Sequence, residues 1–123
     1  MKSHSILLFD SELSESPLGP IVFLLSGNSP SEAVPLVAFS KTGHPVVVGR
    51  VDSFVCSPKT MYGKITFLPD RESQSFEKLW DANASHSSST QNTISETYNI
   101  LGNGKQIGIL ASKWELKSVS IQF

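Results

Sequence analysis

Several features that would point to a particular function are scarce in this sequence. The 123 residues include one cysteine, Cys56, so neither an internal disulfide nor a cysteine-based zinc site can form. The net charge is −1, with ten basic and eleven acidic residues, which leaves no electrostatic footprint for nucleic acid or an anionic membrane. The few aromatic residues are not interleaved with Lys or Arg, as a stacking platform for single strands would require. We therefore expect neither nucleic-acid nor membrane partners.

Long hydrophobic runs are also missing. The apolar stretches at residues 6–9 and 21–25 are too short for a signal-peptide core or a bilayer span. The overall apolar content of 39% is nevertheless ordinary for a globular chain. We expect a single domain over residues 1–123 with one hydrophobic core, located in the cytoplasm of the cell that makes it. A virus particle assembled in that cytoplasm is compatible with this location.

Motifs for metals and cofactors are lacking as well. His4, His44 and His86 have no second histidine or carboxylate at metal-ligand spacing. The Gly-Asn-Gly-Lys sequence at residues 102–105 lacks the Ser or Thr that follows the lysine of a phosphate-binding loop, and it favours a tight hairpin turn. We expect no metal and no cofactor, and we expect Cys56 to be a half-buried apolar thiol.

Short β-type segments, separated by turns rich in Gly, Pro and Ser, make up most of the chain. At residues 64–67, Ile65 and Phe67 alternate with Lys64 and Thr66, which is typical of a half-buried strand. A turn is expected at residues 41–45 and a serine-rich loop at residues 85–89. Strands are expected over residues 6–9, 21–25, 34–39, 46–55, 62–68, 93–101, 106–110 and 114–123.

One segment, residues 70–82, has the pattern of a helix. Asp70 can act as N-cap, and Phe76, Leu79 and Trp80 form an apolar stripe at i, i+3 and i+4. The order of strands, one helix and further strands favours an α+β domain. We expect it to be mostly β, with a mixed or antiparallel sheet or a small barrel.

Serine hydrolysis is the one chemistry that the residue types permit. It requires a serine, a base that accepts its proton, and donors for the oxyanion. Serines are abundant, so the choice depends on the base. His44 lies in a turn between two apolar runs, and His86 lies beside Ser85 and Ser87 in the serine-rich loop. Either of these imidazoles is a candidate base.

The order of motifs from residue 34 onwards resembles that of the phage prohead (capsid maturation) serine proteases. The similar segments are an apolar strand, a strand with the sequence Val-Gly-Arg-Val, a third strand, a helix, a nucleophile strand and a closing strand. In this chain they are residues 34–39, 46–51, 62–67, 76–80, 94–98 and 114–121. The resemblance covers residues 34–123. Residues 1–33 lie outside it, and we expect them to complete the sheet or to form an arm that contacts a neighbouring subunit.

The resemblance implies Ser95 as nucleophile and His44 as general base, with Ser88 or Ser89 as alternative nucleophiles. The chain departs from the family pattern in three places. No histidine occurs at residues 39–41, no glycine follows Ser95, and Lys117-Ser118 stands where an acidic residue is usual. These departures favour a short, degenerate relative.

Three functions remain open for this sequence. The first is a non-catalytic virion or head-assembly protein with a prohead-protease-like fold, which binds capsid or scaffold subunits and forms part of an oligomer in the virus head. The second is an active capsid-maturation serine protease that cleaves scaffold or capsid precursors. The third is an unrelated small β-rich interaction module, since an exposed strand edge or apolar patch suits that role.

Overall fold

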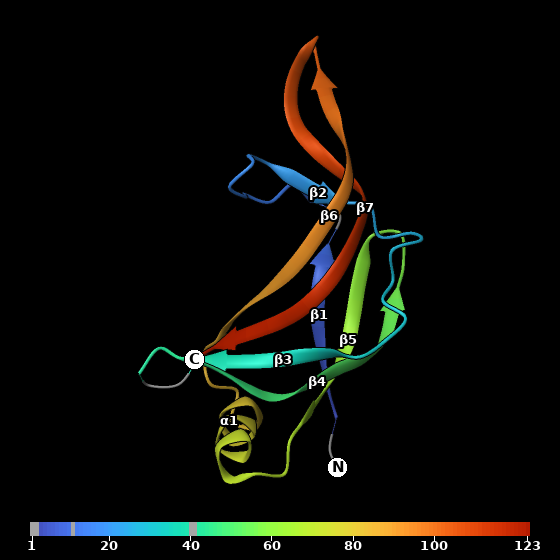
Figure 1. Cartoon of the computed structure of the whole chain (residues 1–123). Coiled ribbons are helices and arrows are strands. Elements are labelled where there is room, and N and C mark those ends of the chain that lie inside the picture. Colours follow the sequence, from blue (N-terminus) through green and yellow to red (C-terminus); the bar gives the residue numbers. More distant parts are fainter. Residues whose placement is uncertain (1–2, 11, 40–41) are drawn as a thin grey trace.

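The computed structural model describes residues 3–10, 12–39 and 42–123, which form seven strands and one helix (Figure 1). Lys41, the first residue of the turn predicted at residues 41–45, lies outside the described residues. The elements in chain order are β1 (His4–Asp10), β2 (Ile21–Phe23), β3 (Val34–Phe39), β4 (Pro45–Cys56), β5 (Thr60–Phe67), α1 (Arg71–Asp81), β6 (Ser87–Gly102) and β7 (Lys105–Gln122).

Helix α1 begins where the sequence predicts. The Asp70 carboxylate accepts hydrogen bonds from the Ser73 backbone N–H at 2.9 Å and from the Ser73 hydroxyl at 2.8 Å, which caps the first turn. The helix ends at Asp81, and beyond it the backbone N–H of Ala82 donates to the Lys78 carbonyl and that of Asn83 to the Trp80 carbonyl. In the part of the chain that the structure describes, no helix has both the length and the apolar character needed to cross a membrane.

The strands form one curled mixed sheet that closes half of a barrel. Its order is β1-β5-β4-β3-β7-β2, and β6 also pairs with β7. The β1–β5, β4–β5, β3–β4 and β6–β7 pairs are antiparallel, whereas β3 and β7 run parallel. The predicted class, a mostly β α+β domain with one short helix, is confirmed.

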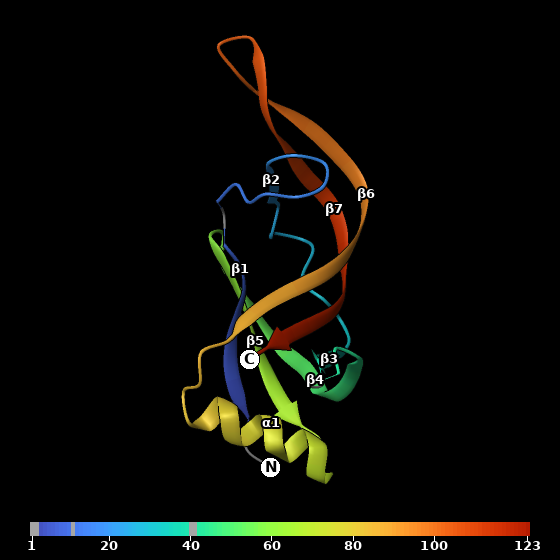
Figure 2. The same ribbon diagram turned by 90° about the vertical axis from the view of Figure 1, so that its left-hand side faces the viewer.

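Strand β7 is continuous, which corrects the prediction of two strands at residues 106–110 and 114–123. Its C-terminal half pairs with β3 at residues 119–121, and its N-terminal half pairs with β2 at residues 109–111. Strand β6 follows it along its whole length and begins at Ser87, so the serine-rich stretch predicted as a loop is strand from Ser87 onwards. The end of this hairpin, residues 98–108, projects from the body and is called the arm here (Figures 1 and 2).

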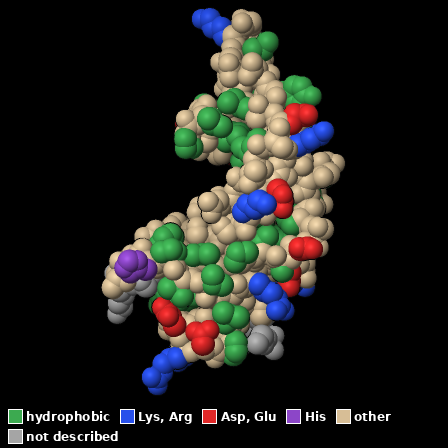
Figure 3. Space-filling model, in the orientation of Figure 1, with side chains coloured by type: hydrophobic (Ala, Val, Ile, Leu, Met, Phe, Trp, Pro, Cys, Tyr) green, Lys and Arg blue, Asp and Glu red, His purple; other side chains and the backbone are tan. Residues whose placement is uncertain are grey.

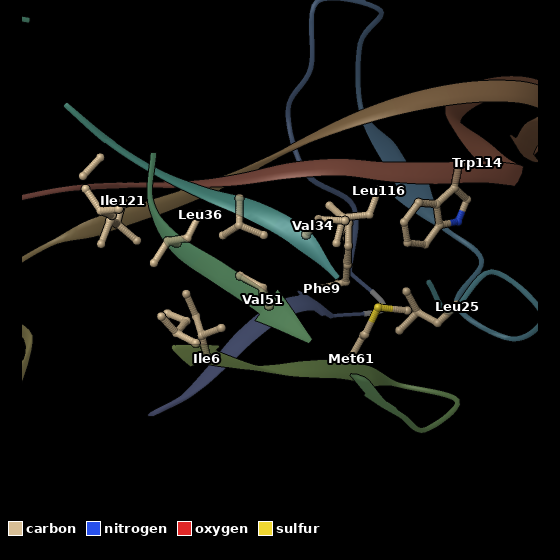
Figure 4. Packing of buried hydrophobic residues seen from close by; sticks show 14 of the residues in the cluster. Ile6, Phe9, Leu25, Val34, Leu36, Val51, Met61, Trp114, Leu116 and Ile121 are labelled. Carbon is tan, nitrogen blue, oxygen red and sulfur yellow. The ribbon is translucent and has the colours of Figure 1, made fainter. Parts of the chain in front are cut away.

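The core lies on the concave side of the curled sheet. An extra residue in β1, Leu8, shifts the β1–β5 register and lets Ile6 and Phe9 both point inwards. Near the top of the body, Phe9 packs against Trp114 with ring centroids 4.6 Å apart, and the Trp114 indole N–H donates to the Leu24 carbonyl at 2.7 Å. Figure 4 shows these aliphatic and aromatic side chains converging from the surrounding strands.

Candidate functional site

Ser95, the predicted nucleophile, is the extra residue of a β-bulge in β6. Ile94 pairs with Trp114 and Glu96 pairs with Lys113, so Ser95 has no partner across the strand. Its hydroxyl donates to the Lys113 carbonyl at 3.2 Å, and the residue is exposed. This hydrogen bond therefore links the bulge in β6 to β7.

The carboxylate beside Ser95 serves the same strand pair. Glu96 accepts a hydrogen bond from the Ser112 hydroxyl at 2.9 Å, and the Lys113 ammonium lies 3.6 Å from its other oxygen. The Ser112 hydroxyl, with a smaller contribution from the Lys113 charge, lowers the pKa of Glu96. These contacts hold Glu96 ionised as a link between β6 and β7.

His44, the predicted base, lies in another part of the body. It is exposed and directly precedes Pro45, which pairs with Phe39 at the end of β3. Because the neighbouring Ala38 pairs with Ile121, His44 lies near the C-terminal end of β7, whereas Ser95 lies beside Trp114. The stretch of β7 between those two points is roughly 20 Å long at the usual strand rise. The structure does not bring His44 and Ser95 together.

The alternative nucleophiles lie at the start of β6. The Ser89 hydroxyl is 2.7 Å from the Ser120 hydroxyl across the strand pair, and Ser88 pairs with Ile121. The nearby His86 ring packs between Trp80, at 4.4 Å, and Phe123, at 5.6 Å. Among the described residues, no imidazole is hydrogen-bonded to a serine hydroxyl.

Two side chains lie in surroundings that sequence reasoning missed. Cys56 lies at the end of β4 and is exposed rather than half-buried, and its thiol donates to the Leu25 and Ser57 carbonyls, each at 3.5 Å. The His4 Nε2–H donates to the Glu77 carboxylate at 3.0 Å, and the His4 ring lies edge-on to Phe67 and Trp80. This contact fastens β1 to α1. Its members are 73 positions apart, so no local sequence pattern reveals it.

A groove separates β1 from β6, which are two of the edge strands of the sheet. Residues 7–10 of β1 form one wall, and residues 88–92 and 94 of β6 form the other. The β1–β2 loop, at residues 12 and 14–18, covers one end, and β2 contributes Ile21 and Phe23. We call it the β1–β6 groove; its volume is about 830 Å³. Figure 2 views the molecule from the side on which β1 and β6 lie. Figure 3 shows, on the left, the hollow in the surface between the part that carries the arm and the body that carries α1.

The chemistry of the β1–β6 groove is mixed apolar and acidic. Apolar side chains come from both walls and from β2, while the charged residues that line it are Asp10, Glu12 and Glu15. Asn92 also lines it, and its side-chain oxygen is a buried acceptor without a hydrogen-bond partner among the described residues. The stretch at residues 87–95, which forms most of one wall, is mainly polar and contains no charge and no proline. Its composition resembles that of a loop, so the sequence alone did not indicate an edge strand there.

Comparison with known proteins adds no relative. No family model, no curated protein and no solved structure matches this chain.

Proposed function

We propose that this chain is a protein-binding component of a virus head that contacts capsid or scaffold subunits and does not cleave them. The proposal is supported by the order of motifs over residues 34–123, which resembles that of the prohead proteases, and by the separation of Ser95 from His44. Removal of the general base from a serine hydrolase lowers its rate by several orders of magnitude. Binding requires no such pair.

The arm is the observation that carries the binding role. Its apolar side chains Tyr98, Leu101 and Ile107 are 59%, 65% and 51% exposed. Lys105 is the one charged residue between residues 98 and 108. Exposed apolar side chains grouped on a projecting hairpin add nothing to the core of the same chain, but they can be buried against a neighbouring protein. The arm therefore suits attachment to a capsid or scaffold subunit.

The test is the presence of the chain in virus heads. Proheads and finished capsids purified from producing cells are expected to contain the wild-type protein, as measured by quantitative mass spectrometry. Leu101→Asp should reduce its content in the particles severalfold, because it places a charge in the apolar contact. Asn99→Asp, which adds the same charge at a polar position of the arm, should have little effect. Absence of the wild-type chain from both kinds of particle would refute the proposal.

A second measurement addresses catalysis. The purified chain is incubated with the scaffold or capsid precursor, and the products are separated by mass. We expect no cleavage above background. Cleavage that Ser95→Ala or His44→Ala abolishes would establish the protease function instead and overturn the binding proposal.

A further inference from the structure

We propose that the β1–β6 groove binds one extended segment of a partner protein, which adds as a strand between the two edges and closes the half-barrel. The identity of that partner, a capsid or scaffold subunit, rests on the proposed function. The chemical nature of the bound segment follows from the walls of the groove.

Both walls of the groove are strand edges. Within the described residues, β1 pairs only with β5 and β6 pairs only with β7. Each strand therefore carries a row of backbone N–H and C=O groups on its second side, and the groove lies between these two sides. An extended peptide is the ligand that such groups recognise, because main-chain hydrogen bonds bind it strand by strand.

The first part of the β6 edge, from Ser87 to Gln91, lacks the features that usually prevent strand addition. Residues 87–95 contain no lysine, no proline and no charge of either sign, and the first charged residue is Glu96. The β6–β7 pairing from Ser87 to Gln91 is regular. Register shifts follow between Gln91 and Asn92 and at Ser95, so the regular edge that can pair with a ligand runs from Ser87 to Gln91.

The direction of the two strands sets the direction of the ligand. Strands β1 and β6 both run from the helix end of the body towards the arm (Figures 1 and 2). A segment that runs the opposite way is antiparallel to both, and antiparallel pairing is slightly more stable per residue than parallel pairing. The amino-terminal end of the bound segment then lies beside Asp10, the last residue of β1.

Acidic side chains of the groove determine which residues suit the amino-terminal end of the bound segment. Asp10, Glu12 and Glu15 line the groove at the end of β1 and in the loop that follows, and none of the described Lys or Arg residues lines it. The ligand is therefore an extended segment with Lys or Arg at its amino-terminal end, followed by apolar residues at alternate positions. Such alternation presents one apolar face to Ile21, Phe23 and Ile94. A ligand N–H donor can also satisfy the Asn92 side-chain oxygen.

The first experiment uses a short fluorescent peptide with two lysines followed by alternating valine and threonine. Fluorescence anisotropy with the full chain should show saturable binding, and the amide signals of β1 and β6 should shift in NMR spectra. A peptide of the same sequence with alternate backbone nitrogens methylated should bind at least about tenfold more weakly, because it has lost its main-chain donors. Equal binding of the two peptides would refute strand addition.

The second experiment tests orientation and charge. Moving the lysines to the carboxyl-terminal end should weaken binding several-fold, and a preference for that peptide would overturn the antiparallel arrangement. Glu15→Lys should also weaken binding several-fold, since surface charge pairs contribute only modestly. Glu32→Lys is the matched control, because Glu32 is exposed and lines a separate hollow beside the β2–β3 loop. An equal loss in both variants would show that only net charge matters and would refute the assignment.

The failure of this inference can be told from the failure of the proposed function. A chain that is present in virus heads but binds no peptide, or whose β1 and β6 edges are covered by a second copy in solution, refutes the groove assignment alone. A chain that binds the peptide but is absent from virus heads refutes the head-assembly role alone.

Discussion

The two ends of strand β7 have opposite surroundings. Towards its C-terminus, β7 lies between β3 and β6, and Leu116, Val119 and Ile121 are buried in the core. Towards its N-terminus, beyond the short pairing with β2, it forms the arm with β6 alone, and Ile107 is half exposed. One continuous strand thus lies inside the sheet of the body at one end and forms half of a two-stranded hairpin at the other.

The difference shows how stability and binding are divided along one element. A two-stranded hairpin is marginally stable in water, because it buries little apolar surface. The arm persists because its strands continue into a sheet that does bury such surface. We expect substitutions in the body to change global stability, and substitutions in the arm to change local opening and partner contact.

The largest expected difference is between Leu36→Ala and Leu101→Ala. Leu36 is fully buried in β3, so its truncation should lower the free energy of unfolding by about 2–5 kcal/mol. Leu101 is 65% exposed on the arm, and its truncation should change that free energy by less than about 0.5 kcal/mol. Urea denaturation followed by circular dichroism measures both. Equal losses would mean that the arm is part of the cooperative core.

Two glycines give a second contrast. A Cβ at Gly49 would overlap the Thr66 carbonyl oxygen of the neighbouring strand, so Gly49→Ala should destabilise the whole domain by about 1–3 kcal/mol. Gly104 has a φ of +78° at the tip of the arm with open space around it. Gly104→Ala should mainly accelerate hydrogen exchange of the arm amides, and Gly104→Asn should restore most of the protection, since Asn tolerates this conformation. Rapid exchange in β4 and β5 of the Gly104 variant would contradict this localisation.

The His4 contact should have a smaller effect than either core change. His4→Ala removes the Glu77 hydrogen bond and the ring contacts with Phe67 and Trp80, and it should lower the free energy of unfolding by about 1–2 kcal/mol. His4→Phe keeps an aromatic ring and should recover part of the loss. Thermal unfolding of the two variants compares them. Identical melting temperatures would mean that the ring contacts contribute nothing.

The smallest expected effect is a dependence on pH. The backbone N–H and the hydroxyl of Ser73 lower the pKa of Asp70 below the usual 3.8, and the Ser112 hydroxyl lowers the pKa of Glu96 below the usual 4.5. Carboxylates with a lowered folded-state pKa contribute stability above the usual value, and that contribution is lost as the pH falls through the folded-state pKa. Stability should therefore decline in acid.

Variants can separate the two groups. Asp70→Asn should flatten the acid decline of global stability, which urea titrations at several pH values measure. Ser112→Ala should leave the global decline nearly unchanged and should alter only the acid response of amide exchange where β6 meets β7. The reverse pattern would contradict the expectation that Asp70 affects global stability and Glu96 only the local pairing of β6 with β7.

Local patterns in the sequence predicted those elements whose cause is local. The helix from Arg71 to Asp81 follows from the Asp70 cap and the apolar stripe, and the hairpin turn follows from Gly102-Asn103-Gly104-Lys105. Strand β6 was predicted too short, because residues 87–92 are polar and face solvent along an edge. The separation of Ser95 from His44 depends on the β3–β7 register, which no local pattern in the sequence encodes.

The sequence by itself determined that the chain is a mostly β domain with one capped helix, because alternation, turn residues and capping act over a few neighbouring positions. Only the tertiary structure decided that β7 is one strand with different neighbours at its two ends, that the sheet curls into an open half-barrel, and that β1 and β6 face each other across a groove. Those features depend on pairings between segments far apart in the chain, where the gain from shared burial, rather than local preference, selects the partner.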